Sequence, residues 1–265
     1  MARINIDGAQ NVEVSIKIPC EKTPLEQLEI MEAYTKAHQE SKDEDKAVRE
    51  LNCLKTIFPR LFRSIEENDL IAGRLDFLPI GFGSVTSIGG VGHYCVFHKL
   101  RAFKDTLEDE ELKKRVDVLY DYWQDNDVKS IYCQDVLNDT TTGRFIDCKY
   151  PFMATARLSG MMLDYKKLVR LGVNGLIDLI EKNESNTFME ACLKTMYLFK
   201  DVIRRQIELV KDAIEKTQDE QRLKDLHLMK EDLVYILNHK PATFHQALQL
   251  FWLYALCAGC INYGR

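Results

Sequence analysis

Hydrophobic residues return at steps of three and four along most of the chain, which is the spacing of an α-helix that buries one face. The longest stripe lies in the second half and is followed by a shorter one. The first stripe comprises Phe188, Cys192, Met196, Phe199, Ile203, Ile207, Val210 and Ile214, and the second comprises Leu223, Leu226, Leu233 and Leu237. The pattern predicts two antiparallel helices joined near residues 216–221. It would equally suit a coiled-coil interaction module.

Two capping boxes mark the starts of further helices. Thr23-Pro24-Leu25-Glu26 places a capping Thr before Pro at the first helical position, with Glu three residues after the cap. Thr243-Phe244-His245-Gln246 repeats the signal after Lys240-Pro241 and opens an apolar helix that should end near Ala258. The spacing also predicts helices over 45–67, 105–123 and 164–181. Pro59 should end or kink the first of these three.

Other segments lack helical periodicity. The first twenty residues alternate apolar and polar positions in places, which favours a short strand or an extended arm. Five glycines between positions 81 and 92 predict an ordered loop or short strands over 68–96. No Gly-x-Gly-x-x-Gly or Gly-Lys-Ser/Thr motif accompanies them, so nucleotide binding is not expected. A polar stretch over 125–144 interrupts the helices again.

Bulk composition narrows the classes of protein. The 265 residues are 46% hydrophobic, enough for a folded core, and the net charge of −5 leaves no basic face for nucleic acid. The chain starts without an apolar signal segment, and Gln249 and Gly259 interrupt its longest apolar run. We therefore expect a soluble, cytoplasmic protein that does not enter a membrane. In that compartment its eight cysteines should be reduced thiols.

Candidate chemistry on residue type alone is sparse. Cys257 and Cys260 form the single Cys-x-x-Cys pair, and His93, Cys95 and His98 lie within six positions. Both groups lack the further ligands that zinc or iron–sulfur sites need, so we expect packing or pocket lining and no metal. Arg157, Arg144 and Asp76 are isolated charges that would bind an anionic substrate or form local ion pairs. Phe251, Trp252 and Tyr254 are spaced to fill a core.

Four segments, in order, resemble a known family. The segment 240–254 contains a Phe-x-x-Ala-x-Gln helix and leads after a short turn into Asn262-Tyr263-Gly264-Arg265, which is similar to the Gly-Arg-x-Asp motif of glycyl radical enzymes of the pyruvate formate-lyase type. The other three segments are Ile65 to Gly73, similar to a Leu-Ile-x-Gly loop, Tyr122-Trp123, similar to a Tyr-Trp-x-Gly-x-Thr segment, and Asp164 to Gly175, similar to an Asp-Tyr-x-x-x-Leu-x-x-Gly-x-x-Gly helix.

The sequence also departs from the family pattern. Gly160-Met161 stands where members often carry Gly-His, and Gly259-Cys260-Ile261-Asn262 stands where many eliminases have His-Ser-x-Ser. The substrate residues of a particular diol or choline lyase are therefore not carried over. The candidates for a substrate pocket are His93, Arg157, Cys260, Asn262 and Arg265.

The resemblance implies an α/β fold in which a ten-stranded barrel is surrounded by helices. Residues 1–265 would be the amino-terminal portion of a single domain of this kind, mainly helical and incomplete at its carboxyl end. The family's thiyl-forming cysteine and its Arg-Val-x-Gly-Tyr glycine loop are absent from these residues. We therefore assign no catalytic residue and expect the chain to be inactive alone.

The resemblance also implies function and partners. The complete enzyme would cleave a C–C, C–O or C–N bond of a small metabolite under anaerobic conditions. The resemblance is closer to the lyases of the family than to its acyltransferases. This portion would bind no cofactor itself. A partner activase using S-adenosylmethionine and an iron–sulfur cluster would install the glycyl radical, and the enzyme would be a homodimer. The alternative is a non-catalytic helical protein-binding module whose working surface is the hairpin over 185–238.

Overall fold

The structure is a computed structural model that describes residues 2–3, 13–14, 21–76, 78–80, 95, 97–127 and 163–261. For positions 2–3, 13–14, 98 and 259–261 it describes the backbone alone. Helices dominate the described residues, which agrees with the prediction of a mainly helical portion. The described strands are β1 (Ala2–Arg3) and β2 (Glu13–Val14), which pair antiparallel. A barrel cannot be recognised among these elements, so it stays a prediction.

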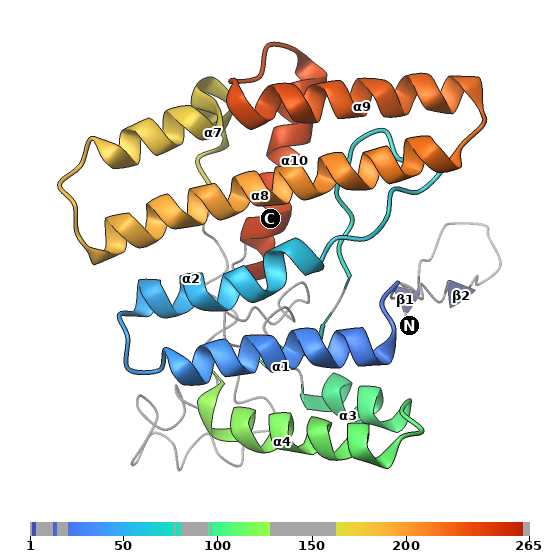
Figure 1. The fold of residues 1–265 in the computed structure, drawn as a ribbon, viewed down its shortest axis with the longest axis vertical. Helices are drawn as coiled ribbons and strands as arrows, with labels where there is room; N and C mark the ends of the chain where they lie inside the picture. The colour runs from blue at the N-terminus through green and yellow to red at the C-terminus, as the bar shows by residue number, and fades with distance from the viewer. Residues whose placement is uncertain are drawn as a thin grey trace.

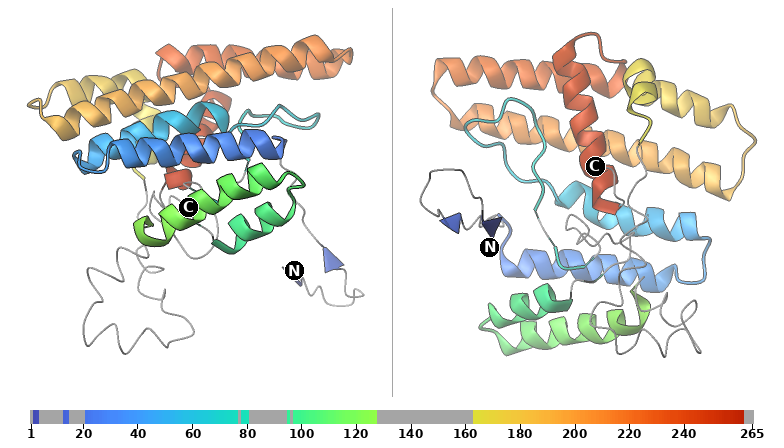
Figure 2. Two further views of the ribbon diagram at one scale, coloured as in Figure 1. Left: turned by 60° about the horizontal axis from the view of Figure 1, so that its bottom comes forward. Right: turned by 180° about the vertical axis from the view of Figure 1, so that it is seen from behind.

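Three helical hairpins form much of the described part of the molecule (Figure 1). They pair α1 (Pro24–Glu40) with α2 (Lys46–Ile57), α3 (Phe97–Asp105) with α4 (Glu110–Asn126), and α8 (Thr187–Lys216) with α9 (Glu220–Asn238). Figure 2 shows the hairpins stacked in layers, with α7 (Tyr165–Glu181) beside α8 in the uppermost layer. The last helix, α10 (Phe244–Ile261), crosses behind α8 in Figure 1 and in front of it in the reverse view of Figure 2.

The helix boundaries follow the sequence signals closely. Thr23 caps α1 with both hydrogen bonds of the capping box, and Gln246 bonds back to the backbone of Thr243 at the start of α10. At Pro59 α2 gives way to the 3-10 helix η1 (Phe58–Arg60), as expected from the missing N–H of proline. Beyond η1, the predicted helix over 61–67 is wrong, because this segment is a loop joined by an antiparallel bridge between Phe62 and Leu75. A second bridge joins Ile80 to Cys95.

One hydrophobic core runs through the layers. Its largest fully buried side chains come from α1, α2, α3, α4, α7 and α8 and from the segment between η1 and α3. They are Trp123, Tyr34, Leu28, Met31, Ile57, Leu61, Leu78, Ile80, Leu100, Leu168 and Ile203. The indole N–H of Trp123 donates to the Thr35 hydroxyl at 2.8 Å, so the buried ring is also satisfied as a donor. No helix in the described part of the chain combines the length and the apolar character needed to cross a bilayer.

Candidate functional site

The loop over residues 66–73 is attached to α10 by a buried glutamine. The backbone N–H of Ala72 donates to Gln249 Oε1 at 2.7 Å, and Gln249 Nε2 donates to the carbonyl of Ala72 at 2.9 Å. Both residues have no exposed surface. Buried backbone N–H and C=O groups need hydrogen-bond partners. The side-chain amide of Gln249 supplies both partners for Ala72, in place of the strand or helix pairing that this loop lacks.

The next residue of the loop is held by a tryptophan on the same helix. Trp252 Nε1 donates to the carbonyl of Gly73 at 2.8 Å. Gly73 has φ of 120°, and a Cβ added there would lie 2.9 Å from Leu253 Cδ2. The close approach of this loop to α10 therefore requires glycine. Trp252 is 38% exposed among the described residues, and its expected packing within a barrel stays a prediction.

Two further side chains fix the start of the loop. Arg222, at the start of α9, donates to the carbonyl of Asp69 at 2.6 Å and to that of Glu66 at 2.7 Å. His245 Nε2 lies 3.1 Å from the carbonyl of Leu70, while its Nδ1 contacts the buried carboxylate of Asp232. Side chains of α9 and α10 thus engage five backbone carbonyls of the loop between residues 66 and 73. We call this assembly the loop clamp.

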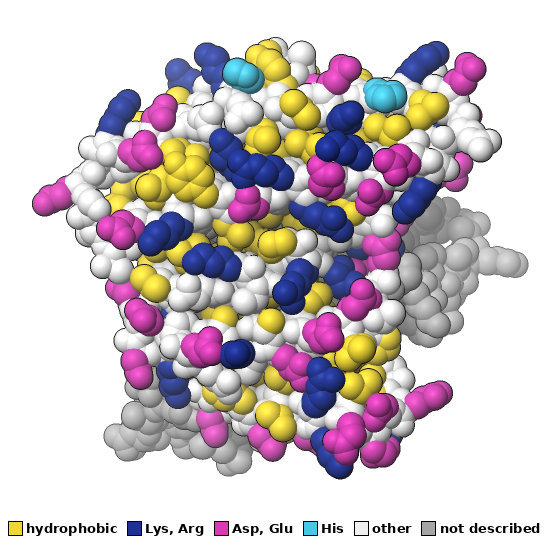
Figure 3. All heavy atoms as spheres, viewed as in Figure 1, with side chains coloured by type: hydrophobic (Ala, Val, Ile, Leu, Met, Phe, Trp, Pro, Cys, Tyr) yellow, Lys and Arg dark blue, Asp and Glu magenta, His cyan; other side chains and the backbone are white. Residues whose placement is uncertain are grey.

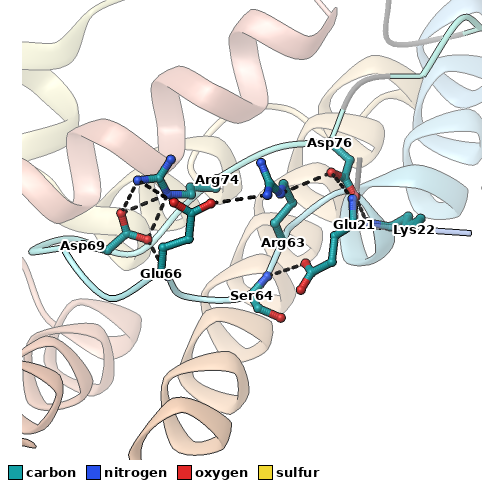
Figure 4. A network of polar contacts seen from close by, with 8 residues as sticks. All are labelled: Glu21, Lys22, Arg63, Ser64, Glu66, Asp69, Arg74 and Asp76. Atoms are coloured by element: carbon teal, nitrogen blue, oxygen red, sulfur yellow. Dashed lines mark hydrogen bonds and ion pairs between the residues drawn. The ribbon is translucent and has the colours of Figure 1, made fainter. Parts of the chain in front are cut away.

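Ion pairs extend the clamp toward the start of α1 (Figure 4). Asp76, which is fully buried, accepts from Lys22 Nζ at 2.6 Å and lies 3.4 Å from Arg63 Nε. Of the two roles expected for the isolated charge of Asp76, substrate binding or a local ion pair, the structure shows the ion pair. At the other end of the network Arg74 bonds to Asp69, and this bond raises the pKa of Arg74.

Glu21 completes this network at its edge. Its carboxylate accepts from the backbone N–H of Ser64 at 2.7 Å. Burial raises the pKa of Glu21. The hydrogen bonds from Ser64 and the nearby cations Arg63 and Lys22 together lower this pKa by more than burial raises it, so the net shift is downward. The segment before α1 is thus held to the loop by charge.

The helix that begins at Asp164 meets α10 from the other side. Asp164 caps α7 by accepting from the backbone N–H of Lys167 at 2.9 Å. The ring of Tyr165 packs 4.5 Å from that of Phe251 on α10. At Gly172, where φ is 68°, α7 kinks, and an added Cβ would lie 2.8 Å from Lys240 Cα. Asp164 therefore starts the helix, while Tyr165 and Gly172 place it against α10 and the segment before α10.

Three of the four segments that carried the resemblance therefore converge on one place. The loop 65–73 and the first part of α7 each contact α10, although the three segments lie far apart in the sequence. The fourth, Tyr122-Trp123, packs elsewhere, where the Tyr122 hydroxyl lies 2.7 Å from His38 Nδ1 on α1. The role of Gln249 follows from its place in the Phe-x-x-Ala-x-Gln segment. The parts played by His245, Trp252 and Arg222 had no separate signal in the sequence.

The pocket candidates named from the sequence are not brought together by the described residues. His93, Arg157, Asn262 and Arg265 lie outside them, and Cys260 lies in the last turn of α10, where no side chain is described. Among the described residues no group of three His, Cys, Asp or Glu side chains is placed to hold a metal ion. Burial raises the pKa of the thiols of Cys95 and Cys257, which keeps both protonated at neutral pH.

Fold and motifs together define a chain of the glycyl radical enzyme class. A model of the pyruvate formate lyase-like family matches residues 4–264, and the chain belongs to that family. Among curated proteins, it is similar to (2S)-3-sulfopropanediol dehydratase from Klebsiella oxytoca, with 27% identity over 163 residues that make up 55% of this chain and 19% of the dehydratase.

Solved structures give the same fold. The glycerol-bound form of the B12-independent glycerol dehydratase from Clostridium butyricum aligns with a TM-score of 0.65 and 18% identity. The alignment covers 95% of this chain and 36% of the dehydratase chain. A glycyl radical enzyme from Archaeoglobus fulgidus aligns with a TM-score of 0.67 and 19% identity, and the alignment covers 92% of this chain and 33% of that enzyme's chain. The chain thus spans about a third of these two structures.

Proposed function

We propose that this chain is the amino-terminal part of a glycyl radical enzyme that removes water from a small hydroxylated metabolite. The observation that carries the proposal is the family match over residues 4–264. The choice of C–O cleavage among the reactions of such lyases rests on two relatives that are named as dehydratases, of sulfopropanediol and of glycerol. The natural substrate of this chain would share their vicinal hydroxyl groups.

The loop clamp supplies a structural role within that function. It joins α10 to the loop over 66–73 through hydrogen bonds of Gln249 and Trp252. The chain leaves α10 directly into Asn262 and Arg265, two of the pocket candidates. Held in this way, α10 would orient these residues toward substrate, since small misplacements in a substrate clamp are costly to rate. His93 and Arg157 are proposed to complete the same pocket.

The radical chemistry itself would reside in a carboxyl-terminal portion. The mechanism needs a stored glycyl radical, a cysteine that abstracts hydrogen and a substrate held within contact distance in a dry cavity. The 265 residues contain neither of the family motifs that carry the first two. The proposal therefore includes that carboxyl-terminal portion, an activase with S-adenosylmethionine and an iron–sulfur cluster, and assembly of the complete enzyme as a cytoplasmic homodimer.

An apolar stripe on α10 supports the need for a further portion. Phe244, Leu248 and Trp252, each one turn apart, are 83%, 37% and 38% exposed. The opposite face of the helix, with Leu250 and Leu253, is fully buried. A row of large apolar side chains left in water marks a surface that another part of a protein covers. Under the proposal, the carboxyl-terminal portion packs there.

The test uses the complete reading frame that contains this chain. Activation by a radical S-adenosylmethionine activase under anaerobic conditions should produce an organic radical signal in electron paramagnetic resonance. The activated enzyme should convert glycerol or propane-1,2-diol to the aldehyde with loss of one water, and the 265-residue chain alone should do neither. A reading frame without a downstream cysteine and Arg-Val-x-Gly segment would overturn the proposal. A radical signal without aldehyde from any diol would overturn the dehydratase assignment alone.

A second candidate function is a helical binding module that works through the α8–α9 hairpin. Tyr197, Leu228 and Val234 on this hairpin are each between 46% and 48% exposed, which favours a docking role. This candidate predicts a protein that is functional without any further portion. Serine substitutions of the exposed apolar residues on α10 and on the hairpin, compared for their effect on partner binding, distinguish this module from the enzyme.

A further inference from the structure

A hollow of about 620 Å³ opens where the start of α7 meets the segment that joins α9 to α10. Its lining is strongly basic, with four cations and a single carboxylate among the described residues. The cations are Lys166, Lys167, Arg170 and Lys240, the carboxylate is Asp164, and the apolar lining is Val169, Leu171 and Pro241. We call this feature the basic hollow. Figure 3 shows Lys and Arg side chains at the edge of the molecule over the start of α7.

The carboxylate in the lining is already engaged. Asp164 accepts from the backbone N–H of Lys167 at 2.9 Å and lies 3.3 Å from Lys167 Nζ. These bonds and the adjacent lysines hold the pKa of Asp164 below its ordinary value. Lys166, Arg170 and Lys240 make no hydrogen bond or ion pair within the described part of the chain. All three are exposed.

Such an arrangement is unfavourable for the isolated molecule. Lys166 and Arg170 lie one turn apart on α7, and like charges at that spacing repel each other on a helix surface. The protein has 41 acidic and 36 basic residues, so counter-charges are available elsewhere but are not placed here. A cluster of uncompensated cations on a net acidic chain is complementary to an acidic partner.

The fold holds the two sides of the hollow in fixed register. Gly172 brings α7 against the backbone of Lys240, and Asn174 Nδ2 donates to the carbonyl of Asn238 at 2.8 Å. Lys200 from α8 bonds to the side chain of the same Asn174 at 2.9 Å. Cations from two distant segments therefore face one hollow without rearrangement, and a partner would meet a preorganised surface.

The lining selects among kinds of partner. A small anion would need a buried polar group aimed at it, whereas these cations are exposed. Nucleic acid is disfavoured by the net charge of −5. Leu171, 37% exposed, adds apolar surface between the cations. We propose that the basic hollow docks an acidic segment of a partner protein that also presents an apolar side chain.

A second copy of this chain does not fit that description. An exposed acidic run, Glu108 to Glu111, lies at the turn between α3 and α4, at the opposite end of the molecule from α7 in Figure 1. That run, like the exposed run Asp43 to Asp45, contains no apolar residue that could meet Leu171. Its docking into another copy would be a head-to-tail contact, which builds rings or open chains of molecules. The partner, which must present an apolar side chain, is therefore assigned to a different polypeptide.

The test measures binding of a short fluorescein-labelled peptide that alternates Glu and Leu, by fluorescence anisotropy with the 265-residue chain. The triple variant Lys166→Gln/Arg170→Gln/Lys240→Gln removes the unpaired cations. The matched control Lys46→Gln/Lys55→Gln/Lys224→Gln removes the same charge from other exposed positions. Far-ultraviolet circular dichroism should be identical for all three proteins, because every substituted side chain is at the surface.

The first variant should bind the peptide about tenfold more weakly, and the control should stay within about twofold of the parent protein. Leu171→Ser should weaken binding of the Glu-Leu peptide while leaving that of an all-Glu peptide unchanged. Absence of peptide binding, or equal losses in variant and control, would overturn the proposal. So would equally tight binding of the all-Glu peptide or of single-stranded DNA, since either result would describe a general anion surface.

Discussion

Two glutamines, Gln249 and Gln206, are fully buried in the described helices, and their side chains differ in their hydrogen bonding. Both polar atoms of Gln249 are bonded to the backbone of Ala72. Both polar atoms of Gln206, in the middle of α8, have no hydrogen-bond partner among the described residues. A buried amide stabilises a fold when its bonds are made and destabilises it when they are not. The two residues should therefore respond to substitution in opposite directions.

Gln249→Leu should lower the free energy of unfolding by about 2 to 4 kcal/mol, because it leaves the N–H and the carbonyl of Ala72 buried without partners. Urea denaturation followed by circular dichroism measures the change. Gln221→Leu, at an exposed position of α9, is the control and should change stability by less than about 0.5 kcal/mol. Equal effects of the two substitutions would contradict the role of the loop clamp.

Gln206→Met should raise the free energy of unfolding by about 1 kcal/mol, since a side chain of similar volume removes two unsatisfied polar atoms. The same denaturation experiment applies. A loss of stability would show that Gln206 is satisfied by a buried water molecule, which a methionine would displace.

Lys200 makes the stability of the molecule depend on pH. Burial lowers its pKa, and the neighbouring charge of Arg204 lowers it further, while Asn174 and Asn238 accept from its Nζ. Between this lowered pKa and the ordinary value of 10.5, the unfolded lysine holds a proton that the folded one has lost. Folding then releases a proton, so stability rises with pH across that window.

The Lys200→Met variant lacks this titration. We expect the free energy of unfolding of the parent protein, relative to Lys200→Met, to increase as the pH is raised through the window toward 10.5. Urea denaturation of both proteins in a series of alkaline buffers measures the difference. A constant or falling difference would show that the pKa of Lys200 is not lowered.

At the scale of elements, two glycines set how closely segments approach. Gly172 lies against backbone atoms of Lys240, which cannot move aside, whereas Gly73 lies against the side chains of Leu253, Leu256 and Trp252. Both have positive φ, which L-residues adopt only with strain. The cost of an added methyl group should therefore depend on which neighbour can yield.

Gly172→Ala should destabilise the protein by about 3 kcal/mol or more, and Gly73→Ala by about 1 to 2 kcal/mol. Thermal or urea unfolding of the two variants gives the ranking. The reverse order would mean that the segment 239–241 shifts more readily than the side chains of α10.

The elements also show where sequence patterns succeed. The long stripes of α8 and α9 and the capping box of α1 were recognised because each depends on neighbours within the same helix. The helix α3 was missed, because its nine residues follow a glycine-rich segment and carry only three apolar positions in the stripe. Packing against α4 stabilises it: the ring of Phe97 lies 5.3 Å from that of Tyr120, and Arg101 lies over the same ring.

In the molecule as a whole, the described residues leave large apolar side chains exposed on α10 and on the α8–α9 hairpin, among other places. If a carboxyl-terminal portion covers α10, Phe244→Ser/Leu248→Ser should reduce the fluorescence of a dye that binds apolar surface. The same variant should abolish the capacity of the chain to bind that portion. Leu228→Ser/Val234→Ser, the matched pair on the hairpin, should leave this binding intact.

The opposite result would favour the helical binding module. In that case the hairpin pair should abolish partner binding, and the α10 pair should have no effect on it. Both variants replace two exposed apolar residues by serine, so general effects on solubility are matched.

Capping, periodicity and short motifs are local properties of neighbouring residues, so they were sufficient to predict the helical character of the chain, most helix boundaries and the family. The sequence placed Gln249 and Gly73 in two separate motifs and Trp252 in a core. Tertiary structure alone decided that these three residues meet, since no periodicity encodes a contact across more than 170 positions. It also decided the burial of Asp76 with its two cations and the basic hollow at Lys240. Such features depend on which surfaces the folded chain brings together, and that is set by the packing of whole helices.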